Sequence, residues 1–161
     1  MQKIRGKEIS YIFQEPLSAL NPLHKIKKQI TEAILIHNPT CPKDTLQKRI
    51  LELLENVSLP PKVLDSYPHE LSGGQRQRIC IAIALANSPK ILIADEPTTA
   101  LDSTTQQQIL ELLQFLQKKL HLSILFISHD LLAVSKLCKK ILVLKQGKII
   151  ENGDTSSIFN S

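Results

Sequence analysis

Short apolar runs and longer periodic segments divide the chain into strand and helix signals. Residues 9–13 predict a short strand, and the isoleucine-rich runs at 90–95 and 123–128 predict strands covered on both faces. Apolar residues at spacings of three and four predict helices at residues 23–36, 46–57 and 103–120. The order of strand, crossover helix and strand over residues 90–128 predicts a parallel α/β unit.

Turn-forming residues mark where these elements stop. The proline-containing stretches at residues 15–22, 38–42 and 59–61 are predicted to be irregular, which leaves residues 23–70 as a small helical insert. Near the C-terminus, residues 139–153 show two strand patterns around Gln146 and Gly147. This pattern predicts a terminal β-hairpin.

Composition limits the class of protein. The chain has 161 residues, of which 42% are apolar and 22% charged, as expected of one soluble globular domain. No apolar run approaches the roughly 18 residues that span a bilayer. The cysteines at 41, 80 and 138 are too widely spaced to suggest disulfides or zinc, which indicates a reduced, cytosolic chain. The net charge of +5 comes partly from stretches of lysine without interleaved aromatic residues, so we expect solvated faces and no nucleic-acid partner.

The stretch "LSGGQ" at residues 71–75 predicts the start of a helix that runs to residue 86. Ser72 is placed to be the N-cap and Gln75 to complete a capping box, which is a purely structural role. Gly73 and Gly74 need another explanation, because a glycine inside a helix costs about 1 kcal/mol relative to alanine. Their bare N–H groups at a positive helix end predict an anion site suited to a phosphate.

Polar side chains follow all three predicted strands. Asp95 and Glu96 end the strand at 90–95, where one carboxylate can hold Mg²⁺ through water while its neighbour faces an attacking water. His129 should emerge at the same sheet edge and can hydrogen-bond a γ-phosphate. Gln14 ends the first strand and can reach Mg²⁺ or water. Taken singly, each residue also fits an ordinary turn or a polar strand end.

In combination these residues resemble the ATPases of ABC transporters. Their order and spacing are similar to the family's Q-loop, signature, Walker B, D-loop and H-loop, carried here by Gln14, residues 71–75, Asp95 with Glu96, residues 100–102 and His129. The stretches "IRGKEISYIFQEPLSALNP", "SYPHELSGGQRQR" and "GKIIENGDTSSIF" are similar to the oligopeptide, dipeptide and nickel importer branch.

The resemblance implies ATP and Mg²⁺ as cofactors. It assigns Glu96 to the hydrolytic water, Asp95 and Gln14 to the Mg²⁺ shell, and His129 to the γ-phosphate. Across a dimer, nucleotide contacts are implied for the signature and D-loop, that is for Ser72, Gly73, Gly74, Gln75 and Asp102. The implied partners are a second ATPase subunit, transmembrane permease subunits and, indirectly, an extracytoplasmic solute-binding protein. The implied location is the cytoplasmic face of the inner membrane.

One family element has no counterpart in these 161 residues. A phosphate loop of the form G-x-x-x-x-G-K-S/T is missing, because Gly6-Lys7 and Gly147-Lys148 lack the preceding glycine. The resemblance implies that the chain begins after that loop. We therefore expect a partial P-loop NTPase core, formed by residues 1–22 and 89–161, with a helical subdomain at 23–88 and a C-terminal hairpin.

Three functional hypotheses follow. The first is the ATP-binding and ATP-hydrolysing fragment of an importer for peptides or a related small solute, inactive on its own because the phosphate loop is missing. The second is a chromosome-maintenance or DNA-repair ATPase, in which a long coiled coil would separate motifs that lie close together here. The third is a non-catalytic remnant or regulatory half-subunit that lends its signature to an intact partner ATPase.

Overall fold

The computed structural model describes residues 4–15 and 19–159. Its centre is a parallel sheet of three strands, β1 (Ile9–Ile12), β2 (Ile91–Asp95) and β3 (Ser123–Ile127), with β2 in the middle. The crossover between β2 and β3 is helix α5 (Ser103–Lys119). The predicted parallel α/β arrangement is therefore present.

The two faces of this sheet have very different surroundings. Register places Ile12, Ala94 and Phe126 side by side on one face, where Ile12 and Ala94 are almost fully buried. The opposite face carries Tyr11 and Leu125, whose exposed fractions are 40% and 52%. The prediction that β2 and β3 are covered on both faces is therefore wrong for the described chain. The apolar runs are long enough for two covered faces, but only one face has packing partners.

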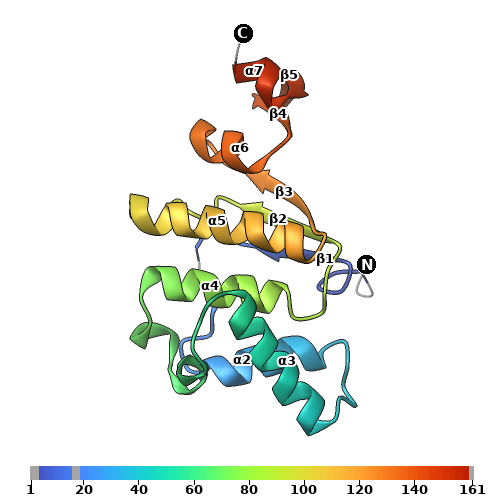
Figure 1. Cartoon of the computed structure of the whole chain (residues 1–161), viewed down its shortest axis with the longest axis vertical. Coiled ribbons are helices and arrows are strands. Elements are labelled where there is room, and N and C mark those ends of the chain that lie inside the picture. The colour runs from blue at the N-terminus through green and yellow to red at the C-terminus, as the bar shows by residue number, and fades with distance from the viewer. Residues whose placement is uncertain (1–3, 16–18, 160–161) are drawn as a thin grey trace.

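The helical part of the chain packs on the covered side. It comprises α2 (Ile26–Leu35), α3 (Lys43–Asn56), the 3₁₀ helices η1 (Pro61–Asp65) and η2 (Pro68–Glu70), and α4 (Gly73–Ala84). In Figure 1, α4 lies between α5 on one side and α2 and α3 on the other. The sequence predicted an interruption, but no 3₁₀ helices, between α3 and α4.

Helix α2 starts three residues later than its apolar pattern suggests. The side-chain oxygen of Asn21 accepts a 2.9 Å hydrogen bond from the backbone N–H of Leu23, so residues 21–23 form a local turn. The Gln29 amide donates to the carbonyls of Asn21 and His24 and holds that turn against the helix. Leu23 is 81% exposed and does not belong to the core face of α2.

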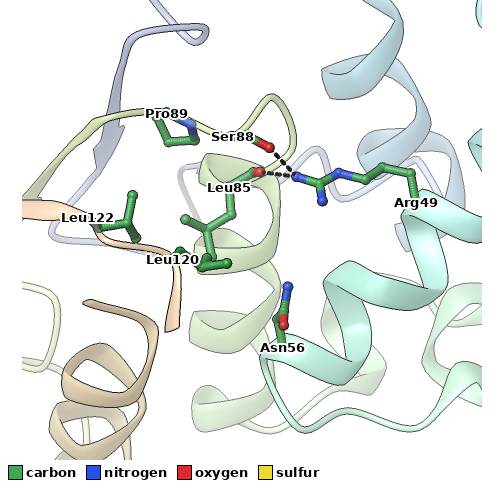
Figure 2. A pocket seen from close by; sticks show the side chains of 7 residues that line it. All are labelled: Arg49, Asn56, Leu85, Ser88, Pro89, Leu120 and Leu122. Carbon is green, nitrogen blue, oxygen red and sulfur yellow. Dashed lines mark hydrogen bonds between the residues drawn. The ribbon is translucent and has the colours of Figure 1, made fainter. Parts of the chain in front are cut away.

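Arg49 joins α3 to the end of α4. Its guanidinium donates to the carbonyl of Leu85 and the hydroxyl of Ser88, both at 2.9 Å (Figure 2). It also donates to the carbonyl of Ala86 at 3.2 Å. These bonds satisfy carbonyls that a helix end leaves free. Helix α4 ends at Ala84, two residues before the predicted end at residue 86.

Beyond β3 the chain forms α6 (Leu131–Leu137), the antiparallel strands β4 (Lys140–Lys145) and β5 (Lys148–Asp154), and α7 (Thr155–Phe159). The hairpin turns at Gln146 and Gly147 as predicted, and both have positive φ angles, 51° and 75°. In Figure 1 this hairpin lies at the far end of the molecule from α2 and α3. Helices α6 and α7 were not predicted. None of the described helices is both long enough and apolar enough to span a bilayer.

Candidate functional site

The carboxyl end of β2 presents two carboxylates in different directions. Asp95 is the last residue of the strand and pairs with Ile127, and its side chain accepts a hydrogen bond from the Tyr11 hydroxyl. Glu96 follows with a φ of 47°, in the left-handed region that non-glycine residues rarely adopt. Its N–H donates to the carbonyl of Ile127 at 2.9 Å. The sharp change of direction brings the Glu96 side chain to the end of β3.

Glu96 and His129 form a direct pair at that edge. Glu96 Oε1 lies 2.6 Å from His129 Nδ1 and also accepts the backbone N–H of His129 at 3.1 Å. Glu96 Oε2 accepts the Thr99 hydroxyl at 2.6 Å. The glutamate side chain is only 17% exposed, whereas the histidine is 76% exposed. A shielded, oriented carboxylate thus lies beside an imidazole that faces solvent.

This pairing shifts the pKa values of the two residues in opposite directions. Burial by itself raises the pKa of Glu96, but hydrogen bonds from Thr99 and His129 outweigh it and hold the pKa below the ordinary 4.5. The hydrogen bond and the negative charge of Glu96 raise the pKa of His129 above its ordinary 6.5. At neutral pH Glu96 is ionised and can accept a hydrogen bond from water. His129 can donate from both ring nitrogens when it is protonated, a form that the raised pKa favours.

Gln14 lies at the same edge of the sheet. It comes two residues after Ile12, which pairs with Ala94, and its side chain is exposed. Together with Asp95 it offers oxygen donors, which Mg²⁺ prefers, and a magnesium ion usually takes few protein ligands and completes its shell with water and phosphates. Within the described ranges no group of three or more His, Cys, Asp or Glu side chains could hold a metal ion. The donors present therefore fit a nucleotide-bound Mg²⁺ better than a metal enclosed by protein.

The signature stretch forms the helix start that the sequence predicts. Ser72 Oγ accepts the N–H of Gln75 at 3.2 Å, and Gln75 Oε1 accepts the N–H of Ser72 at 2.9 Å, which completes the capping box of α4. The N–H groups of Gly73 and Gly74 belong to the first turn, where no intrahelical acceptor exists. This end of α4 can therefore accept an anion.

Asp102 has a clear structural role in this chain. Its carboxylate accepts the N–H of Thr105 at 3.0 Å and caps α5, and this bond lowers the pKa of Asp102 below its ordinary value. The first turn of α5 lies against the first turn of α4, since a Cβ added at Gly74 would meet the Thr105 methyl group. Among the described residues, no hydrogen bond joins the signature to Glu96 or His129. The structure thus gives two separate groups of candidate residues.

Sequence reasoning missed two members of the site. Neither Tyr11 nor Thr99 belongs to a motif that the sequence indicates. Alternation of side chains places Ile93 and Asp95 on one face of β2, but only the register of β1 against β2 adds Tyr11 to that face. The pocket in Figure 2, lined by residues such as Pro89 and Leu122, lies near the starts of β2 and β3 and is therefore remote from Asp95.

The sequence also matches known proteins. The chain is 52% identical to an oligopeptide transport ATP-binding protein, OppD, of Bacillus subtilis, over 99% of this chain and 45% of that protein. It is 50% identical to a dipeptide transport ATP-binding protein, DppD, of Lactococcus lactis, over 98% of this chain and 46% of that protein. The chain thus spans about half the length of these relatives.

Solved structures give the same result for the fold. The chain superposes with a TM-score of 0.86 on cbiO1 of Clostridium perfringens, part of an ABC transporter complex, at 31% identity over 95% of this chain and 59% of that one. The ATP-binding cassette MJ0796, a dimer bound to ADP and phosphate, matches with a TM-score of 0.80 at 33% identity over 95% of this chain and 65% of that one. Residues 1–99, which are more than half of the sequence, match the ABC transporter family. As the resemblance of its motifs indicated, the chain belongs to the ABC transporter family.

Proposed function

We propose that the chain is part of the ATP-binding and ATP-hydrolysing subunit of an importer for peptides or a related small solute. The observation that carries this proposal is the shielded Glu96 carboxylate held against His129 at the carboxyl edge of a parallel sheet. Ligands collect at this edge in open α/β folds. The transported class is supported by relatives that are named as oligopeptide and dipeptide transport proteins.

In the proposed reaction Glu96 orients the attacking water and accepts its proton as the new bond to the γ-phosphorus forms. The bond between that phosphorus and the β,γ-bridging oxygen breaks at the same time. The water must bind to one of the two carboxylate oxygens of Glu96. Oε2 already accepts a hydrogen bond from Thr99, and Oε1 is already hydrogen-bonded to His129. The oxygen that binds the water therefore accepts a further hydrogen bond or loses its present partner. In its protonated form His129 donates from its second ring nitrogen to a γ-phosphate oxygen, while Nδ1 keeps its hydrogen bond to Glu96.

Asp95 and Gln14 are proposed to hold Mg²⁺ through water. When bound, the ion neutralises charge on the β- and γ-phosphates. Tyr11 already donates a hydrogen bond to Asp95 and fixes the orientation of that carboxylate. These residues supply only one side of the reaction site, because the 161 residues contain no G-x-x-x-x-G-K-S/T loop to cradle the phosphates.

The second group of residues is proposed to act on a nucleotide held by another subunit. Ser72, Gly73 and Gly74 would cap its γ-phosphate from the start of α4, and Gln75 and Asp102 would complete that surface. A second ATPase subunit is therefore the expected direct partner, in line with the dimeric cassette that this chain resembles. The same arrangement would let a half-subunit lend its signature to an intact partner, which is the alternative function.

We also propose a division of the chain between its partners. Residues 1–22 and 89–161 form the core, whereas residues 23–88 form a helical subdomain that faces transmembrane permease subunits. A solute-binding protein outside the cytoplasm would act indirectly through those permeases. The proposal places the protein at the cytoplasmic face of the inner membrane, bound peripherally. Its support is that the similar cbiO1 is part of a transporter complex.

The test of the signature function mixes this chain with an intact homologous subunit whose own signature is disabled by a Ser→Arg change. Formation of the complex is first measured by sedimentation, and ATP turnover is then measured in the same mixture. We expect the chain to restore turnover, because the homologue supplies the phosphate loop and its own glutamate. No turnover in a demonstrated complex would contradict the proposal and favour a non-functional remnant.

Two variants separate the roles within that assay. Ser72→Arg should abolish the rescue, because a bulky side chain obstructs the phosphate despite its favourable charge and removes the cap of α4. Glu96→Gln should leave the rescue intact, because the rescued site would use the homologue's own glutamate. Loss of rescue with Glu96→Gln would mean that the two groups of residues act at one site.

A further inference from the structure

The first turns of α4 and α5 approach each other more closely than ordinary side chains allow. A Cβ atom built on Gly74 would lie 2.6 Å from the Thr105 Cγ2 atom, whereas one built on Gly73 would lie 3.4 Å from the end of Leu101. The first distance is too short for two carbon atoms, and the second is an ordinary contact. Any residue larger than glycine at position 74 must therefore displace Thr105 or separate the two helices.

Thr105 cannot easily move aside. Its N–H donates to the Asp102 carboxylate at 3.0 Å, which fixes its backbone in the capped first turn of α5. A threonine side chain is branched at Cβ and has few rotamers in a helix, so its methyl group has few alternative positions. The side chain is also partly buried between the helices. The steric limit at Gly74 is thus set by a rigid neighbour.

We infer that Gly74 and Thr105 form a steric pair that sets the spacing between the first turns of α4 and α5. Thr105 is then a positioning residue for the signature, and Gly74 is needed for helix packing. This inference rests on the proposed function of the signature. It distinguishes two adjacent glycines that the sequence treats alike, because only Gly74 is packed too closely to accept a Cβ atom.

The first measurement is a double-mutant cycle on the whole chain, in which thermal unfolding measures the stability of each variant. Gly74→Ala should lower the midpoint by about 5 °C, even though alanine favours helix, because the added methyl overpacks the contact. Thr105→Ser removes only the γ-methyl, so the double variant Gly74→Ala/Thr105→Ser should recover most of that loss. The matched control is Gly74→Ala/Thr105→Val, which keeps the methyl and should not recover. A Gly74→Ala chain as stable as the wild type would overturn the inference.

The second measurement asks whether the spacing also sets the signature's function, using the complex with a signature-disabled homologue. Gly74→Ala should lose at least tenfold in rescued turnover, and Gly74→Ala/Thr105→Ser should return to within about threefold of the wild type. A double variant that regains stability but not turnover would overturn the inference, because the methyl group itself would then block the phosphate. If the wild-type chain gives no rescue, the proposed function fails, and the double-mutant cycle still decides whether the steric pair exists.

Discussion

The two faces of the parallel sheet should respond very differently to the same substitution. Leu92 of β2 is fully buried under the helices, whereas Leu125 of β3 is 52% exposed on the opposite face. Leu92→Ala removes buried carbon atoms and leaves a cavity, which typically costs about 3 kcal/mol of unfolding free energy. Leu125→Ala removes atoms that are already half in water and opens no cavity. Its cost should be about 1 kcal/mol or less, scaled from the roughly 2 kcal/mol for burying a whole leucine side chain.

The assay is urea unfolding of each variant followed by circular dichroism at low protein concentration. Leu132→Ala serves as the reference for an exposed site, since Leu132 is 72% exposed on α6. If Leu125→Ala is as costly as Leu92→Ala, the open face is buried in solution and the described arrangement is refuted.

We further expect the chain to self-associate through this face and its unpaired strand edge, so Leu125→Glu should reduce the sedimenting oligomer.

Two further predictions concern the candidate site. The pKa of His129 is raised by Glu96, so the pair's stabilisation is complete below the ordinary value of 6.5 and is lost as pH rises through the raised pKa. Titration by NMR should show the His129 midpoint falling towards 6.5 in Glu96→Gln, and an unchanged midpoint would disprove the pairing. The isolated chain should hydrolyse ATP no faster than Glu96→Gln, and phosphate release clearly above that control would show that it needs no external phosphate loop.

The fold was predictable where local pattern determines structure. The period of apolar residues identified the strands and α5, and Gln146 with Gly147 marked the hairpin turn. Helix ends were less predictable, because distant residues set them. Arg49, far away in sequence, donates to the carbonyls of Leu85 and Ala86 just after the end of α4 and so satisfies them there. Nothing in the local sequence near residue 84 reports that contact.

The open sheet face shows a different limit of sequence reasoning. Leu92 and Leu125 belong to similar isoleucine-rich runs, and hydrophobicity alone assigns them the same environment. Their exposed fractions differ because helices lie over only one face of the sheet. Burial of a strand depends on which other elements pack against it, and that information is not contained in the strand's own residues.

The position of the main candidate residues at one sheet edge was predictable, but their contacts, and the presence of Tyr11 and Thr99 among them, were not. Motif order placed Asp95, Glu96 and His129 at one sheet edge, and the structure agrees with that placement. The hydrogen bond between Glu96 and His129 depends on the left-handed backbone at Glu96, for which glutamate has no intrinsic preference. The contact of Tyr11 with Asp95 depends on the register between β1 and β2. Both features arise only when the strands come together.

Two departures from local rules occur within the candidate site, and each has a tertiary cause. Glu96 adopts a φ of 47°, which costs a non-glycine residue on the order of 1 kcal/mol, and its bonds to Ile127, His129 and Thr99 maintain that conformation. Gly74 weakens the first turn of α4, and the close approach of Thr105 requires it. In both cases contacts between segments that are distant in sequence maintain a locally unfavourable backbone conformation or residue type. Such conflicts between local preference and tertiary contact are expected where a chain positions groups for chemistry, because a side chain chosen only for stability would have avoided them.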